Sequence, residues 1–284
     1  MFLLELKHPN IIKLENIIRA ENDKDIYLVF EHMDIDLYLL VRENILEEKH
    51  KKFIFFQIVK AIYYIHSGGL IHRDIKPSNI LVNENCEAKL CDFGLVRSVD
   101  DETEEQEDVL TEYIATRWFR APEILLGSRT YSKAIDIWSL GCLLGEMIKG
   151  KPLFPGNSTK NQIEKVLMWT GPPTKHDLEG LNTKFGKEMF EMLLKVKKIN
   201  ASEWFPNISP DCLNLISRML EFNPEKRLKI EEVIQHPYLK DFFDQSVIED
   251  SDKKIKIPIN DNHRLSLKDY RVLLYQEIKK RAKP

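Results

Sequence analysis

Long apolar runs are absent from the sequence. A membrane-spanning helix needs a stretch of about 18 apolar residues, which the chain lacks, and its apolar opening contains Glu5 and has no basic region. A large charge excess is absent too, because the formal net charge is -3, so neither nucleic acid nor an anionic membrane is expected as a partner. We expect a soluble intracellular protein of the cytoplasm, with the nucleus as a second location.

Paired cysteines are missing as well. The 4 cysteines form no Cys-x-x-Cys motif, which excludes a zinc finger and favours buried free thiols. Apolar residues are plentiful, since 43% of the 284 residues are hydrophobic. This is enough for one large domain or two small ones.

Strand patterns come first in the chain and helical patterns follow. Residues 11–20 and 25–31 are rich in β-forming residues and are separated by a polar turn, which predicts a strand pair. Apolar residues at helical spacing predict a long core helix over 47–66, ended by Gly68-Gly69. Short strands are expected near 70–72, 80–82 and 88–91, and helices over 133–149, 159–169, 209–221, 229–235 and 266–281. The pattern predicts an α+β fold.

Two motifs carry charged and amide side chains at fixed offsets. They are His72-Arg73-Asp74-Ile75-Lys76-Pro77-Ser78-Asn79 and Asp92-Phe93-Gly94. Either motif alone is common by chance, and a coincidental surface loop is the alternative interpretation. In their joint order and spacing they resemble the catalytic loop and metal-binding segment of protein kinases.

The resemblance implies a role for each of these residues. Phosphoryl transfer needs a carboxylate to orient the attacking hydroxyl, a cation on the moving phosphate and oxygen ligands for Mg²⁺. The matching residues are Asp74 for the hydroxyl, Lys76 for the phosphate, Asn79 and Asp92 for the metal, Thr116 to tie Asp74 to Lys76, and His72 as a structural support.

The resemblance extends downstream. Thr111-Glu112-Tyr113 is similar to the activation motif of mitogen-activated protein kinases of the extracellular-signal-regulated type. Family membership implies a buried ion pair between Glu123 and Arg227 and a brace on the catalytic loop from Asp136.

Phosphorylation at Thr111 and Tyr113 is implied, by an upstream kinase or by autophosphorylation. Each phosphate adds about -1.5 to -2 charge to a segment that already contains the acidic run 100–108, so cations are needed to hold it. Arg73 and Arg97 are expected to bind the first phosphate. Arg117 and Arg120 are expected to bind the second. The alternative is that Thr111 and Tyr113 are ordinary exposed loop residues.

Nucleotide and docking contacts are implied at other positions. The segment Phe30-Glu31-His32-Met33 resembles the adenine-binding hinge, with the backbones of Glu31 and Met33 pairing with the base. Asp36 is a candidate ribose contact and Leu81 a candidate floor for the adenine, although a structural role suits both equally. Asp244 resembles part of an acidic docking site for basic peptides, but Val247 stands where a second acid is expected.

Three parts of the family pattern cannot be assigned in this sequence. They are the Gly-rich loop, the strand lysine and the helix glutamate that pairs with that lysine. We expect the sequence to be an N-terminally incomplete fragment of an active kinase. A genuine short product is the alternative, and its open strand edges would need a partner.

The resemblance predicts a kinase-like fold with a mainly α-helical C-lobe and a two-strand remnant of the N-lobe sheet. The expected parts are a partial N-lobe over 1–31, the hinge and C-lobe over 32–245 with the activation segment at 92–123, and an extension over 246–284 whose helix packs back on the N-lobe side.

The implied function is a serine/threonine kinase that uses ATP and Mg²⁺ on Ser-Pro or Thr-Pro sites and binds docking peptides. Two alternatives stay open. One is a non-catalytic binding module, and the other is a scaffold in which Lys76 or another lysine replaces the strand lysine.

Overall fold

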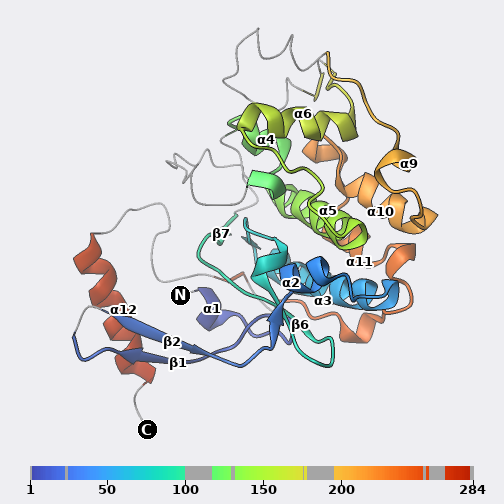
Figure 1. Ribbon diagram of the computed structural model, residues 1–284. Helices are drawn as coiled ribbons and strands as arrows, with labels where there is room; N and C mark the ends of the chain where they lie inside the picture. The colour runs from blue at the N-terminus through green and yellow to red at the C-terminus, as the bar shows by residue number, and fades with distance from the viewer. Residues whose placement is uncertain are drawn as a thin grey trace.

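The computed structural model describes residues 2–22, 25–99, 117–128, 132–174, 176–177, 195–251, 254–255 and 266–281. A long β-ribbon stands beside a body of helices (Figure 1). Strands β1 (Leu14–Arg19) and β2 (Ile26–Phe30) form this ribbon as an antiparallel pair. The predicted strand pair is confirmed.

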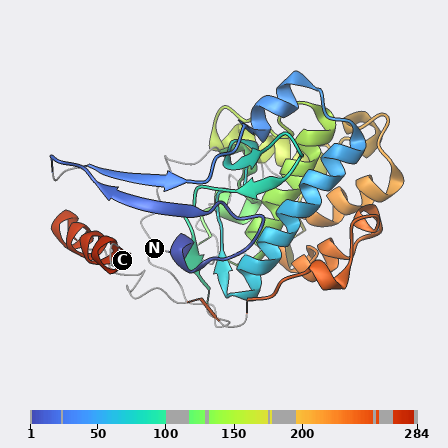
Figure 2. The same cartoon turned by 90° about the horizontal axis from the view of Figure 1, so that it is seen from below.

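The ribbon is thinly covered. Of its residues only Ile17 is buried, whereas Tyr27 is 60% and Leu28 51% exposed. Helix α12 (Leu267–Arg281) lies alongside the ribbon in both views (Figure 1, Figure 2), and the guanidinium of Arg19 sits 4.6 Å from the ring centre of Tyr275. The terminal helix therefore covers one side of β1.

The segment that leads into the ribbon differs from the sequence prediction. The strand begins at Leu14 and not at residue 11, because Ile11 and Ile12 pack instead against strand β6 (Ala88–Leu90). The backbone N–H of Ile12 donates to the carbonyl of Leu90 at 2.9 Å, and Leu90 donates to the carbonyl of Asn10 at 2.9 Å. These bonds fix the base of the ribbon to the helical body.

Two small sheets line the border between the ribbon and the helices. Strand β5 (Ile80–Val82) pairs with both β6 and β3 (Ile35–Asp36). Strand β4 (Leu70–Ile71) pairs with β7 (Arg97–Ser98). These short strands carry the loops that hold the predicted catalytic residues.

The helical body is built around two apolar helices. Helix α3 (Glu48–Ser67) packs against α5 (Ala134–Lys149), and most of the residues in each helix are buried. Helices α2 (Leu37–Glu43), α4 (Pro122–Leu125), α6 (Thr159–Thr170), α9 (Ala201–Trp204), α10 (Pro210–Met219) and α11 (Ile230–Ile234) surround them, with a short helix α1 (Phe2–Glu5) near the ribbon.

These bounds agree with the periodicity of the sequence to within a few residues. The α+β class is confirmed. A serine hydroxyl accepts a backbone N–H at the start of α6 and of α10, where Ser158 and Ser209 serve as N-caps.

Helix α5 carries a buried acid with no catalytic assignment. Glu146 is only 3% exposed, and its Oε2 has no hydrogen-bond partner within the part of the chain that the structure describes. Burial raises the pKa of Glu146 from 4.5 to about 7. The carboxyl is therefore protonated in the folded state under mildly acidic conditions, whereas in the unfolded chain it is already ionised.

This difference predicts a pH-dependent stability. Between pH 4.5 and 7 the folded state holds a proton on Glu146 that the unfolded state has lost, so the free energy of unfolding falls as the pH rises. We expect Glu146→Gln to raise the free energy of unfolding by about 1–3 kcal/mol over the wild type at pH 8, and by much less at pH 5. Urea unfolding at both values measures this, with the exposed Glu203→Gln as control. An equal gain at both pH values would contradict the prediction.

Candidate active site

The predicted catalytic loop runs from β4 to β5 and brings together a carboxylate, an ammonium and an amide. The Asp74 Oδ2 accepts from Lys76 Nζ at 2.6 Å and from Asn79 Nδ2 at 2.8 Å. Asn79 Nδ2 also donates to the backbone carbonyl of Asp74 at 2.9 Å. The three side chains that the sequence placed at offsets of two and five residues therefore meet at one carboxylate.

The backbone of this loop is held from beneath by helix α5. Asp136 is fully buried, and its two carboxylate oxygens accept the N–H groups of His72 at 2.8 Å and Arg73 at 2.9 Å. His66 of α3 also lies 2.9 Å from Asp136 Oδ2 through its Nε2. Burial raises the pKa of Asp136, but the hydrogen bonds with His66 and with the loop backbone outweigh it and lower the pKa below 3.8.

The loop backbone departs from ordinary conformations where it bends. Arg73 adopts a positive φ of 70°, a region that side-chain-bearing residues rarely occupy. The bond from its N–H to Asp136 compensates for this strain. The carboxylate on α5 thereby shapes the loop that presents Asp74.

His72 supports the loop through its imidazole ring. It is fully buried, and burial lowers the pKa of its imidazole. Its Nδ1 accepts the backbone N–H of Asp74 at 3.3 Å, and its ring meets Phe93 edge-on with centroids 5.1 Å apart. A neutral imidazole is the form that can accept this bond.

The second motif lies next to the first. The backbone N–H of Cys91 donates to the carbonyl of Asn79 at 2.9 Å, which brings Asp92 beside the catalytic loop. Asp92 has a φ of 58° and accepts the N–H of Gly94 at 3.3 Å. A Cβ on Gly94 would lie 3.2 Å from Asp92 Oδ1, so glycine leaves this carboxylate room.

The oxygen groups here suit a magnesium ion. Asn79 uses only its Nδ2 in the hydrogen bonds given above, so its Oδ1 can face a cation together with the Asp92 carboxylate. Burial, and then the nearby carboxylates of Asp92 and Asp36, raise the pKa of the Cys91 thiol to about 12, so this neighbouring thiol adds no charge to the site. This donor set fits a hard divalent cation and the phosphates that accompany it.

The predicted nucleotide residues are arranged along β2, β3 and β5. The pairing of β3 with β5 places Asp36 directly opposite Leu81. Asp36 also caps helix α2, since its Oδ1 accepts the N–H of Leu39 at 2.9 Å. The sequence did not predict this second task, which uses one of its two oxygens.

At the hinge the side chain of Glu31 is already committed. It accepts the backbone N–H of Lys13 at 2.7 Å and pairs with Lys89 Nζ at 3.0 Å. Its own N–H donates to the carbonyl of Lys13 at 3.1 Å, so its carbonyl is the backbone group left for a base. Met33, two residues on, is half-buried.

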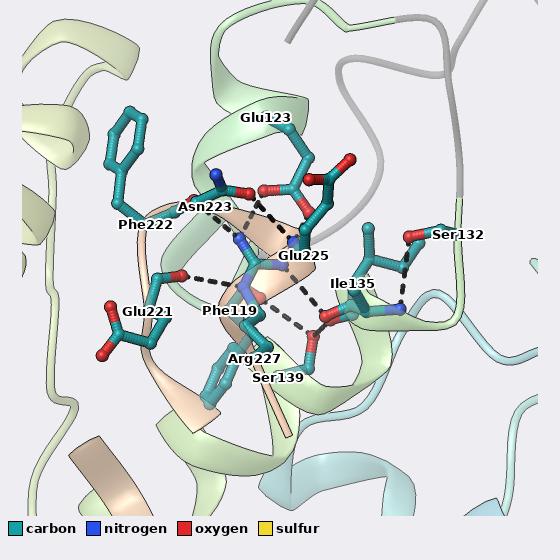
Figure 3. Close-up of polar contacts among 11 residues, drawn as sticks. Phe119, Glu123, Ser132, Ile135, Ser139, Glu221, Phe222, Asn223, Glu225 and Arg227 are labelled. Carbon is teal, nitrogen blue, oxygen red and sulfur yellow. Dashed lines mark hydrogen bonds and ion pairs between the residues drawn. The ribbon is translucent and has the colours of Figure 1, made fainter. Parts of the chain in front are cut away.

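Glu123 and Arg227 form a buried ion pair (Figure 3). Both guanidinium ends donate to the carboxylate at 2.6 Å, and the two side chains are at most 4% exposed. Arg227 also donates to the carbonyls of Glu221, Ala134 and Phe222 at 2.8, 3.0 and 3.1 Å. The pair joins α4 to the segment before α11.

Three of the four predicted phosphate-binding arginines lie close to the ends of segment 100–116, which is outside the described residues, and Arg73 is the exception. Arg73 is in the catalytic loop and Arg97 in β7, while Arg117 begins a 3₁₀ turn and Arg120 follows it. Thr111, Tyr113 and Thr116 lie outside the described residues, so the structure says nothing of their contacts.

At the candidate docking acid the structure shows a local role. Asp244 accepts the N–H of Ser246 at 2.9 Å and caps a short 3₁₀ turn. Nearby, the rings of Phe242 and Phe53 meet at a tilt with centroids 5.3 Å apart, and Lys52 pairs with Asp241 at 2.9 Å. The sequence analysis missed this lysine–aspartate pair, which neutralises part of the acidic surface.

A second missed feature links the N-terminal segment to the helical body. Gln57 of α3 accepts from Asn10 Nδ2 and from the backbone of Ala88, both at 3.0 Å, and donates to the carbonyl of Cys86 at 2.8 Å. A glutamine inside the apolar run Phe53–Val59 was the available signal, because a buried polar side chain needs partners.

Comparisons with known proteins agree with this geometry. The model of the protein kinase domain matches residues 1–239. The chain is 47% identical to extracellular signal-regulated kinase 2 of Dictyostelium discoideum over 100% of its own length and 78% of that protein. It is 49% identical to mitogen-activated protein kinase 15 of Xenopus laevis and 43% identical to extracellular signal-regulated kinase 7 of Drosophila melanogaster, over 99% and 95% of its length.

The matched share of these relatives differs. The chain spans 49% of the Xenopus protein and 30% of the Drosophila protein. Among the residues that the structure describes, no helix has the length and apolar character to cross a membrane. The family model, the identity to the Dictyostelium kinase and the joined catalytic motifs all agree: the chain belongs to the mitogen-activated protein kinase family.

Proposed function

We propose that this chain is the catalytic part of a serine/threonine kinase that transfers the γ-phosphate of ATP to Ser-Pro and Thr-Pro sites. The observation that carries the proposal is the convergence of Lys76 and Asn79 on the Asp74 carboxylate at 2.6 and 2.8 Å. Each group has the charge and reach that phosphoryl transfer needs. The cytoplasm, with the nucleus as a second location, is part of the proposal.

The proposed roles follow from chemistry. Bound ATP with Mg²⁺ supplies the phosphoryl group and neutralises charge on it. Asn79 and Asp92 would hold the metal, and the hinge backbone of Glu31 and Met33 would bind the base. Asp36 and Leu81, paired across β3 and β5, would contact the ribose and the adenine ring.

Asp74 would act on the attacking hydroxyl. Its Oδ2 is oriented by Lys76 and Asn79, so Oδ1 is the atom that can accept a hydrogen bond from a substrate serine or threonine and later its proton. Lys76 would then stabilise the negative charge on the transferred group, because its ammonium lies 2.6 Å from the Asp74 carboxylate that would orient the substrate hydroxyl. In the proposed kinase, Thr116 ties these two residues together.

Activation is proposed to follow phosphorylation at Thr111 and Tyr113, by an upstream kinase or by the protein itself. Two phosphates would meet these four arginines, Arg73 and Arg97 for the first and Arg117 and Arg120 for the second. Charge-assisted hydrogen bonds from arginine are strong enough to order such a loop.

Matched peptides test the substrate proposal. The protein expressed from its complete coding sequence should phosphorylate a Ser-Pro peptide roughly 10–200-fold better in kcat/KM than the same peptide with Ser-Ala. Treatment with a phosphatase that removes both activating phosphates should lower the rate on the Ser-Pro peptide. Equal rates on the two peptides would contradict proline selectivity, and no phosphate transfer to either would contradict the enzyme.

A non-catalytic binding module is the second candidate. It is favoured by the exposed apolar face of the ribbon, where Tyr27 is 60% exposed, and by the lack of an assignable Gly-rich loop in this chain. Calorimetric titration of the chain with Mg-ATP discriminates the two. The module should bind a basic docking peptide without saturable binding of nucleotide, whereas saturable nucleotide binding supports the kinase.

A further inference from the structure

The turn after helix α3 holds two distant segments through neighbouring carbonyls. The carbonyl of Gly68 accepts the N–H of Ile255 at 2.8 Å, and the carbonyl of Gly69 accepts the N–H of Val99 at 2.8 Å. Ile255 belongs to the C-terminal extension, and Val99 is the last described residue before the segment that carries Thr111 and Tyr113. One turn thus connects two parts of the chain that are more than a hundred residues apart.

Ile255 is packed on this turn tightly. It is 8% exposed, and a Cβ built on Gly68 would lie 2.7 Å from its Cδ1 and 3.0 Å from its Cγ1. Gly68 itself has an ordinary φ of -73°, so its lack of a side chain is required by the contact and not by the backbone. Gly69, in contrast, has a φ of 76° and needs glycine for conformation.

The residues just before Ile255 follow the outer side of α3. The N–H of Ser251 donates to Ser67 Oγ at 2.9 Å, and Asp250 accepts a hydrogen bond from the Tyr63 hydroxyl. One turn of helix earlier, Glu249 lies within electrostatic reach of Lys60. Residues 249–251 and 254–255, here called the strap, thus follow the end of α3 and its turn, from near Lys60 past Tyr63 and Ser67 to Gly68.

The other side of the turn contacts the activation segment through a strand pair. Strand β7 pairs with β4 through Leu70 opposite Ser98 and Ile71 opposite Arg97. The bond from Val99 to Gly69 extends this short pairing by one more link. A pair of two-residue strands is only marginally stable, so the hydrogen bond from Val99 to Gly69 contributes much of the stability of the β4–β7 pair.

We propose that the strap is a conformational clamp, which fixes the Ser67–Gly69 turn and through it anchors the activation segment at Val99. Release of the strap frees the turn, and the β4–β7 pair then opens more often. Because Arg97 lies in β7, the clamp sets the position of a proposed phosphate-binding arginine. The effect of the clamp on phosphate binding by Arg97 rests on the proposed function, whereas the clamp itself does not.

Hydrogen exchange followed by mass spectrometry tests the clamp on the full 284-residue chain. Ser67→Ala removes the acceptor for Ser251 and should speed exchange of the peptides covering 94–99 and 248–255 by roughly fivefold, the effect of one lost hydrogen bond. Ser209→Ala is the matched control, because Ser209 Oγ likewise accepts a backbone N–H, from Cys212 at 3.4 Å. It should leave both peptides unchanged.

A pair of substitutions gives a sharper test. Gly68→Ala keeps the backbone φ but collides with Ile255 Cδ1, so exchange in both peptides should rise about tenfold. Ile255→Val removes that methyl and leaves the 3.0 Å contact with Cγ1, so it should restore most of the slow exchange when combined with Gly68→Ala. Faster exchange of 248–255 without any change at 94–99 would overturn the clamp, and so would a failure of Ile255→Val to rescue. Neither readout needs kinase activity, so loss of the proposed function leaves the test intact.

Discussion

Asp74→Asn should lower the rate of phosphoryl transfer by roughly 10²–10⁴-fold, the usual contribution of a positioned acid–base group. The asparagine keeps the size of the side chain and loses the negative charge that holds Lys76 at 2.6 Å. Its amide can satisfy Asn79 or Lys76 but offers no carboxylate oxygen to a substrate hydroxyl. We expect kcat to fall with little change in KM for ATP, because no part of the proposed nucleotide site is altered.

The measurement compares initial rates on a Ser-Pro peptide that lacks a docking sequence. Asp241→Asn is the matched control, because it also removes a carboxylate from a lysine, Lys52 at 2.9 Å, on the surface of the helical body. Thermal unfolding of both variants checks that the fold is kept. If Asp74→Asn and Asp241→Asn turn over at the same rate, Asp74 has no part in the reaction.

Breaking the Glu123–Arg227 pair from one side should cost about 3–5 kcal/mol of unfolding free energy. Arg227→Met leaves the Glu123 carboxylate buried with no counter-charge, and three backbone carbonyls lose a donor as well. The loss is large because the pair is almost completely removed from water. Guanidinium chloride unfolding at pH 7 provides the measurement.

An exposed pair on the same part of the molecule serves as control. Arg218 and Glu232 are 3.6 Å apart and about half exposed, so Arg218→Met should cost no more than about 1 kcal/mol. Restoring stability requires removal of both buried charges, and the double variant Glu123→Met with Arg227→Met should be more stable than Arg227→Met alone. A double variant that is less stable than the single one would argue against an unpaired charge as the cause.

The long helices could be predicted because their apolar periodicity agrees with their packing. Residues 47–66 were expected to be helical and α3 spans Glu48–Ser67, while the predicted 133–149 became α5 at Ala134–Lys149. In both cases most of the helix is buried, so the apolar periodicity of the sequence and the tertiary packing favour the same conformation. The catalytic loop is a different case, because its interpretation came from motif resemblance and not from periodicity.

Contacts between distant segments could not be predicted from the sequence. Ile11 looked like the start of a strand, but its backbone partner is Leu90, which no local pattern identifies. Gly68 was interpreted as a helix stop, and nothing in its surroundings indicated that Ile255 fills the space beside it. Such contacts depend on where the chain returns in space, which a single sequence does not specify.

Single residues with two tasks were also hard to foresee. Asp36 was expected at the ribose, and the structure adds its role as the cap of α2. The composition of a short motif shows which chemistry is available, but it does not show how many partners share one carboxylate. The same holds for Glu31, whose side chain is occupied by Lys13 and Lys89.

The hold that Asp136 has on the catalytic loop has an evolutionary consequence. Its carboxylate binds the backbone of His72 and Arg73 and does not depend on their side chains. These two bonds can therefore persist when a side chain of the loop is exchanged, so the path of the backbone is set by helix α5. Related kinases with the same Asp136 brace can differ in the surface residues around the site and so act on different substrates, while the catalytic residues stay the same.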